Sequence, residues 1–201
     1  GDRRARERPK DAPADYAHLV VLAQNAEGYR NLIKLSSRGY LEGFYRKPRI
    51  DRAILEEHSA GLVVLSACMS GEVARNLQIG RVDRAREAAE WYARSFPGRY
   101  FLEVQNHGIP GQAEINEGIF QFAEELGLPV LVTNDAHYLR REDADAHDTL
   151  LCIGTGAMKS DTNRLSFHGQ ESYFKSAEEM AALFPERPDL LETTLHVAEL
   201  C

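Results

Sequence analysis

Short, almost wholly apolar runs alternate along this chain with longer amphipathic stretches, and this alternation constrains the fold more than any other feature. Runs this short suit strands that are buried on both faces, whereas helices need longer segments with helical spacing of apolar residues. Strands that alternate with helices pair in parallel, so the sequence predicts an α/β sheet or barrel. The apolar runs lie at residues 19–23, 61–66, 100–104 and 129–133.

The intervening helices are predicted from their end signals. Asn25 is a residue type that caps a helix start, and Ser176 with Glu179 forms the pattern of a capping box. Gly127, with Pro129 beyond it, is typical of a helix end. Helices are therefore expected after Asn25, at residues 70–78, 82–96, 112–126 and 143–153, after Ser176, and from residue 190 onwards.

Size and composition indicate one globular domain. The chain has 201 residues, of which 43% are hydrophobic, enough for an ordinary core. Residues 1–15 are charged and poor in large apolar side chains, so we interpret them as a disordered lead-in or loop. No apolar run approaches the length of a membrane span, and a cytoplasmic location without membrane contact is expected.

Charge and cysteine usage narrow the function classes. The net charge of −7 argues against a broad surface for phosphate backbones, although bound cations can bring a nucleic-acid end into a narrow pocket. The three cysteines are unevenly spaced, which disfavours a disulfide framework and leaves them as thiols or metal ligands. The Walker, dinucleotide-binding and serine-hydrolase patterns are absent from the sequence.

Four candidate metal ligands flank the predicted strands. His18 precedes the first strand, Cys68 follows the second, and Asp135 and His137 follow the fourth. In an α/β fold, chemistry collects at the carboxyl ends of the strands. An extended Asp135–His137 segment would turn both side chains to the same side. Imidazole, thiolate and carboxylate together suit zinc, with iron or manganese as alternatives.

Each ligand has a structural alternative. His18 alone fits a hydrogen-bonded core histidine, Cys68 a small buried hydrophobe, and Asp135 with His137 a pair of turn or cap residues. Their joint placement at strand ends favours a shared site. Among the other candidates, His107 is interpreted as a supporting residue, His147 as packing under the site and His58 as a helix C-terminal residue. Glu103, at the end of the third strand, stays in reserve as an alternative ligand.

Several longer motifs carry a family resemblance: His18-Leu-Val-Val-Leu-Ala-Gln24, Gly28-Tyr-Arg-Asn-Leu-Ile-Lys-Leu-Ser-Ser37, Gly39-Tyr-Leu-Glu-Gly-Phe-Tyr45, Leu65-Ser-Ala-Cys-Met-Ser-Gly-Glu72, Tyr100-Phe-Leu-Glu-Val-Gln-Asn-His-Gly108, Pro129-Val-Leu-Val-Thr-Asn-Asp-Ala-His-Tyr138 and Tyr173-Phe-Lys-Ser-Ala-Glu-Glu-Met-Ala-Ala-Leu-Phe184. In order and spacing they resemble the PHP (polymerase and histidinol phosphatase) domain of bacterial DNA polymerase III alpha subunits. The resemblance extends from Tyr16 to Cys201.

The resemblance implies an incomplete, distorted (β/α)7 PHP barrel at residues 16–158 and a helical connector into the polymerase palm at residues 159–201. It places His18, Cys68, Asp135 and His137 on ligand positions of a trinuclear centre for divalent ions, with zinc first and manganese, iron or magnesium as alternatives. The family's opening His-x-His strand and further ligands do not precede Tyr16. The polymerase aspartates are expected beyond Cys201, so this segment should lack the polymerase active site and part of the metal site.

By the same resemblance, the parent molecule is a DNA-directed DNA polymerase, a nucleotidyltransferase of chromosome replication. Its partners are DNA, held by the rest of the polymerase, and other replicase subunits, namely the sliding clamp and a proofreading subunit. The PHP portion then acts as a 3′–5′ proofreading exonuclease or as a metal-stabilised scaffold. Two rivals stay open: a free-standing PHP phosphatase, such as a histidinol-phosphate phosphatase, and a metal-free structural module.

Overall fold

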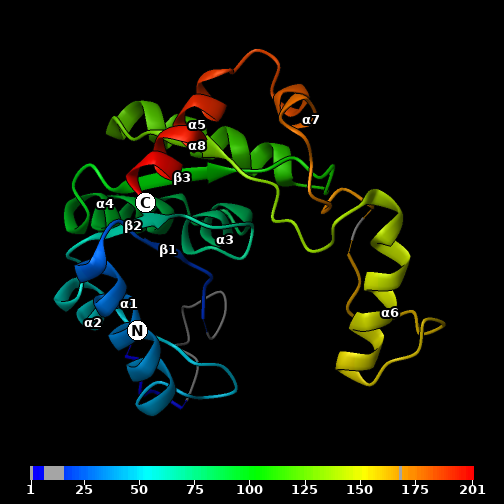
Figure 1. Cartoon of the computed structure of the whole chain (residues 1–201), viewed down its shortest axis with the longest axis horizontal. Coiled ribbons are helices and arrows are strands. Elements are labelled where there is room, and N and C mark those ends of the chain that lie inside the picture. The colour runs from blue at the N-terminus through cyan, green and yellow to red at the C-terminus, as the bar shows by residue number, and fades with distance from the viewer. Residues whose placement is uncertain (1, 7–15, 168) are drawn as a thin grey trace.

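A four-stranded sheet forms the centre of the molecule in the computed structural model, which describes residues 2–6, 16–167 and 169–201 (Figure 1). The strands lie in the order of the sequence: β1 (Val20–Ala23), β2 (Leu62–Leu65), β3 (Tyr100–Val104) and β4 (Val130–Val132). β2, β3 and β4 run parallel to one another, as the alternation of strands and helices predicts. The mixed α/β class is therefore confirmed.

The direction of β1 corrects the prediction, because β1 pairs with β2 in the antiparallel sense. α1 (Ala26–Leu41) and α2 (Arg52–Glu57) carry the chain away from the sheet and back to the end where β1 finished. Gln24 N, just after β1, donates to the carbonyl of Gly61, just before β2, at 2.9 Å. A parallel pair needs a crossover to the opposite end of the sheet, and this connection does not make one.

The helix boundaries follow the local end signals. Asn25 accepts a hydrogen bond from Gly28 N, Gly127 ends α5 (Gln112–Leu126) in the left-handed conformation, and Ser176 forms a capping box with Glu179. These caps satisfy backbone groups that the helix itself leaves unpaired. The other helices are α3 (Glu72–Gln78), α4 (Val82–Ser95), α6 (Ala144–Thr155), α7 (Ala177–Leu183) and α8 (Asp189–Leu200), with a 3-10 turn at Arg141–Asp143.

The two faces of the sheet carry different cores. Even-numbered positions of β2 and β3, such as Val64 and Leu102, belong to the larger cluster packed by α1 to α5, because side chains alternate along a strand. The odd-numbered positions, with Val63 and Phe101 among them, form a smaller cluster that includes Val197 of α8. Thr194 of α8 also donates to the carbonyl of Val132 in β4 at 2.9 Å. Part of the predicted connector therefore packs onto the sheet.

Burial departs from the sequence prediction at the first strand. The apolar run predicts a strand buried on both faces, but the four residues of β1 are only half-buried, since β1 lies at one edge of the described sheet. In α1, the apolar residues Tyr29 and Ile33 are 61% and 49% exposed. Asn31 and Leu35 are buried instead. The buried face of α1 is thus turned relative to its aromatic positions.

α6 stands apart from the sheet, joined to it by two extended segments (Figure 1). Cys152 is the buried residue of this helix, and the bidentate ion pair of Arg164 with Asp148, at 2.5 and 2.8 Å, ties the following loop back to it. At the other end of the molecule, Arg3 bridges Glu42 and Asp51, which holds residues 2–6 against α1. The rest of the predicted lead-in lies outside the described residues. Among those residues, the structure contains no helix of the length and apolarity that a membrane crossing requires.

Candidate metal centre

The reversed direction of β1 brings the first candidate ligand to the carboxyl ends of the parallel strands. His18 lies just before β1, and in the antiparallel pair Val20 faces Leu65 at the end of β2. His18 N donates to the carbonyl of Ser70 at 2.9 Å, which fixes the histidine against the turn after β2. The Nδ1 atom of His18 consequently lies 3.6 Å from Sγ of Cys68, close enough for both to meet one ion.

One cavity of about 290 Å³ contains three of the four predicted ligands. His18, Cys68 and Asp135 line it, and they come from the start of β1 and the segments after β2 and β4. The structure therefore places these three residues on one cavity at the strand ends. The other lining residues are Leu19, Val20, Ala67, Glu103 and Gln105.

Tight backbone geometry positions Cys68. The preceding residue, Ala67, has φ 64°, in a region that L-residues other than asparagine and aspartate rarely adopt. Gly71 closes the same turn so tightly that a Cβ there would lie 2.1 Å from the carbonyl oxygen of Ser66. Strain of this kind persists where the surroundings hold the backbone in place. The turn after β2 therefore presents Cys68 to the cavity as a fixed group.

The backbone at Asp135 differs from the extended form considered from the sequence. Asp135 has φ 42°, so the segment from Asp135 to His137 is not extended. Nδ1 of His137 lies 3.9 Å from Oδ1 of Asp135, and its ring packs on Phe167 with centroids 4.5 Å apart. His137 does not line the cavity. The two residues are neighbours, but only Asp135 faces the space that His18 and Cys68 share.

Glu103 lines the cavity but is not among the four ligands that the sequence predicts. Its Oε1 accepts hydrogen bonds from Thr133 Oγ1 and, at 3.2 Å, from Gln105 Nε2. Its Oε2 is buried and has no partner among the described residues. Burial raises the pKa of this carboxyl above its ordinary value, and the nearby Asp135 charge adds to the effect. A lone carboxylate inside the apolar run Tyr100–Val104 was the signal that could have found it.

Local structure explains three further histidines, His107, His147 and His58. His107 is buried, and its Nε2 contacts the carbonyl oxygen of Asn134 at 2.8 Å while its Nδ1 contacts Gln112 Nε2 at 3.2 Å. Both ring nitrogens are thus engaged, Nε2 with the loop after β4 and Nδ1 with the start of α5. His147, in the first turn of α6, packs its ring at a tilt against the rings of Tyr138 and His137. His58 is the C-terminal cap of α2, as predicted.

The donor chemistry of the cavity fits a divalent metal, but the described residues do not complete a site. An imidazole, a thiol and two carboxyls face one space, and Glu103 Oε2 is an unpaired buried oxygen of the kind that a cation would satisfy. Burial raises the pKa of the Cys68 thiol, so a bound metal would have to displace its proton. Within the described part of the chain, no group of three or more such side chains stands in coordinating arrangement.

A substitution at Glu103 tests how much the unpaired, buried carboxylate costs in stability. In metal-free protein at pH 7–8, Glu103→Gln should raise the melting temperature by a few degrees, because the amide keeps the Oε1 hydrogen bonds and removes the buried charge. The folded-state pKa is raised, so the glutamate costs stability as pH rises through that pKa. The difference in melting temperature between Glu103→Gln and the wild type should therefore shrink as pH falls toward the ordinary glutamate pKa. Calorimetry across this pH range measures the difference, and an equal melting temperature at every pH would contradict it.

Comparison with known proteins places the chain in a family. A family model described as the PHP domain matches residues 4–107, which is more than half of the chain. The chain belongs to the PHP domain family. The match includes β1 to β3 together with His18, Cys68 and Glu103 of the cavity.

The similarity to curated relatives extends beyond the residues that the family model matches. This chain is 47% identical over 184 residues to a DNA polymerase III subunit alpha from Borreliella burgdorferi, covering 92% of this chain and 16% of the relative. Proteins of the same name from Deinococcus radiodurans and Thermus aquaticus are 45% and 42% identical, over 100% and 98% of this chain and 15% and 16% of theirs. The chain therefore spans about one sixth of the length of these relatives.

Proposed function

We propose that this chain is the PHP segment of a bacterial DNA polymerase III alpha subunit, a DNA-directed DNA polymerase. The observation that carries the proposal is the similarity to such subunits, at 42–47% identity over 92–100% of the chain. A free-standing phosphatase would share the PHP match over residues 4–107. It would have no reason to share the similarity through α6, α7 and α8.

We further propose that the cavity at the strand ends holds divalent metal ions. His18 and Cys68 supply a nitrogen and a sulfur ligand 3.6 Å apart, and Asp135 and Glu103 supply oxygen ligands on the same cavity. His137, beside Asp135, would join them after a small rotation of its ring away from Phe167. This mixed donor set favours zinc, with manganese, iron or magnesium as alternatives. The remaining ligands would come from polypeptide outside this segment.

Bound divalent ions would supply a water of lowered pKa and positive charge against a phosphodiester. The chain's own residues shape the rest of the site. Gln105 and Thr133 hold Glu103 in place through hydrogen bonds to Oε1, which leaves its buried Oε2 without a hydrogen-bond partner among the described residues. The strained turn at Ala67 holds Cys68, and the hydrogen bond to the Ser70 carbonyl holds His18. Such a site serves either 3′–5′ exonucleolytic proofreading or metal-dependent stabilisation of the polymerase.

The proposal extends to the domain organisation of the chain. Residues 16–158 would be the C-terminal part of a distorted (β/α)7 PHP barrel, and residues 159–201 would lead toward the palm, with α8 packed on β4 on the way. A cytoplasmic replicase would supply the partners, namely DNA, the sliding clamp and a proofreading subunit.

Metal content and nuclease activity of the full-length polymerase test the function. We expect several divalent ions per molecule after purification without chelator, and removal of 3′-terminal nucleotides that stops when they are stripped. The Cys68→Ser variant should lose the bound ions and also the hydrolytic activity. Its polymerase activity, at a separate site, should continue. If ions bind but no hydrolysis occurs, the scaffold role stands. Absence of bound metal from the wild-type protein would contradict both roles.

A further inference from the structure

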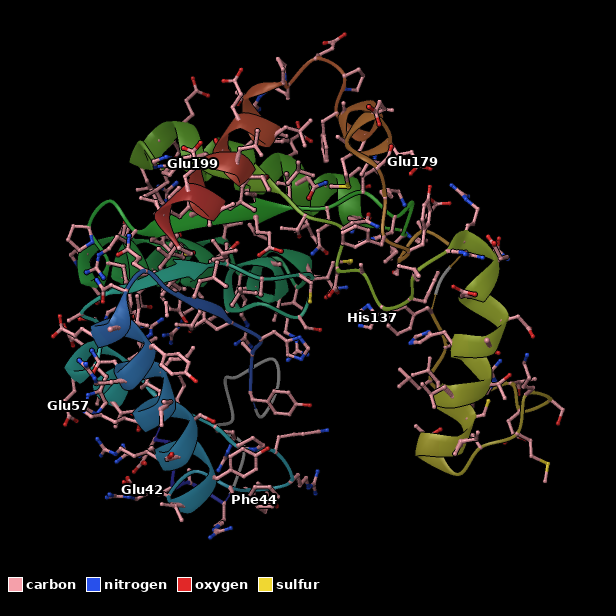
Figure 2. The ribbon with its side chains drawn as sticks, viewed as in Figure 1. Glu42, Phe44, Glu57, His137, Glu179 and Glu199 are labelled. Carbon is pink, nitrogen blue, oxygen red and sulfur yellow. The ribbon has the colours of Figure 1, made fainter. Side chains whose placement is uncertain are left out.

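An exposed pair of aromatic rings marks the C-terminal end of α1. Tyr40 is 61% exposed and Phe44 is 48% exposed, and their rings stack with centroids 6.2 Å apart and planes inclined by 21°. Figure 2 shows Phe44 at the lower end of α1, beside Glu42. Two buried glycines hold the backbone behind the rings. A Cβ at Gly43 would lie 2.0 Å from the carbonyl oxygen of Arg49, so the loop folds closely onto the helix end.

Basic side chains surround the ring of Tyr45, the residue that follows Phe44. The guanidinium carbons of Arg6, Arg46 and Arg49 lie 5.4 to 5.9 Å from the ring centroid of Tyr45. Arg49 donates to the carbonyls of Gly43, Arg3 and Ala5, so it stabilises the loop from behind. Arg46 and Lys47 are exposed at the tip of a turn in which Tyr45 N donates to the carbonyl of Lys47 at 3.1 Å.

The backbone at the tip of this turn is strained. Arg46 has φ 64°, a conformation that costs free energy for a side chain of this size and that clusters at binding sites. The Arg46 guanidinium lies over the ring of Tyr45, the residue that follows Phe44. The residues Tyr40, Phe44, Tyr45, Arg46 and Lys47 are named here the α1-end surface.

Three carboxylates in the described segment from residue 42 to residue 57 are engaged by arginines outside the α1-end surface. Glu42 pairs with Arg3, Arg4 and Arg38, Asp51 pairs with Arg3, and Glu57 pairs with Arg38. The arginine bonds hold the pKa of Glu42 down to about 2, so it stays ionised and paired throughout the neutral range. In a chain of net charge −7, exposed Arg6 and Lys47 therefore make this region locally basic beside exposed aromatic faces. Its charge complements a polyanion.

We propose that the α1-end surface binds single-stranded DNA, with bases stacked on Tyr40 and Phe44 and a phosphate beside Lys47. Stacked aromatic faces flanked by basic side chains are the features that bind unpaired bases without regard to sequence. Duplex DNA keeps its base faces covered and would leave the rings unused. A protein partner would use the rings but would have less use for the basic tip. The proposal goes beyond the metal centre, because none of the cavity-lining residues belongs to this surface.

The test uses the full-length protein in chelator, so that metal-bound DNA in the cavity makes no contribution. Oligonucleotides of deoxythymidine with 5-iododeoxyuridine are photo-crosslinked to the protein, and the crosslinked peptide is mapped. Binding of the same oligonucleotide is measured by fluorescence anisotropy over a range of salt. The variants are the double substitution Tyr40→Ala with Phe44→Ala, the single substitution Lys47→Gln, and Tyr29→Ala as control. Tyr29 lies on the same helix and is also 61% exposed.

We expect crosslinks within residues 40–47 and a loss of affinity of about 5- to 50-fold in the aromatic double variant, as for removal of a base-stacking residue. Lys47→Gln should reduce the salt slope by about 0.7, the value of one phosphate contact on a single strand. Tyr29→Ala should bind as wild type. All variants should melt like wild type, since the side chains are exposed. Crosslinks only outside residues 40–47, or unchanged binding in the aromatic double variant, would overturn the proposal, whatever other partner the surface has.

Discussion

Asp135→Asn in the full-length protein should weaken metal binding by more than the roughly 10- to 100-fold that loss of an outer-shell partner causes. Asp135 faces the cavity together with His18 and Cys68, and its carboxylate is the most exposed of the proposed oxygen ligands. An amide keeps the size of the side chain but removes the charge that a divalent ion needs. The expected result is therefore a loss of ions with little change in the metal-free protein.

Stability should follow the metal. A ligand present at 100 times its dissociation constant stabilises the folded state by about 2.7 kcal/mol, and this contribution disappears when binding fails. The melting transition of the PHP region should fall in Asp135→Asn and in wild-type protein treated with chelator, to the same temperature. Asp83→Asn, a change to an acidic residue outside the cavity at the start of α4, is the matched control. Unchanged melting of the wild type on chelation would point to a metal-free scaffold.

Gly28→Ala should destabilise the domain by about 3 kcal/mol or more, because a methyl group there has no space. A Cβ on Gly28 would lie 1.8 Å from the carbonyl oxygen of Gly61, and Gly61 itself adopts φ 68°. The obstacle is backbone rather than a flexible side chain, so α1 must move away from the start of β2. That movement strains the contact of Gln24 with Gly61, which sets the direction of β1.

Hydrogen–deuterium exchange in the full-length protein measures this effect locally. Amides of β1 and of α1 should exchange faster in Gly28→Ala, while those of β3 and β4 change less. Gly154→Ala is the control, because a Cβ there meets nothing within 4 Å and alanine favours a helix more than glycine does. Equal protection of β1 in Gly28→Ala and wild type would show that the close approach of the two glycines does not hold α1 in place.

Local signals in the sequence determined the elements and their ends. Asn25, Gly127 and the Ser176–Glu179 pair mark helix ends correctly because a cap depends on backbone groups only a few residues away. The apolar runs mark all four strands for a similar reason, since a strand buried in a sheet needs apolar side chains along its own length. Placement of His18, Cys68 and Asp135 on one cavity also followed from their positions beside these strands.

Only the tertiary structure decided how these pieces face one another. The direction of β1 depends on the path of the chain through α1 and α2, and no residue near β1 indicates that path. Whether Glu103 can act as a ligand depends on its burial and on its hydrogen bonds with Thr133 and Gln105. The contact of the His137 ring with Phe167 follows the left-handed backbone at Asp135. Such features arise from packing between segments distant in sequence. The sequence by itself therefore determined which residues reach the strand ends, and the tertiary structure decided which of them share a cavity.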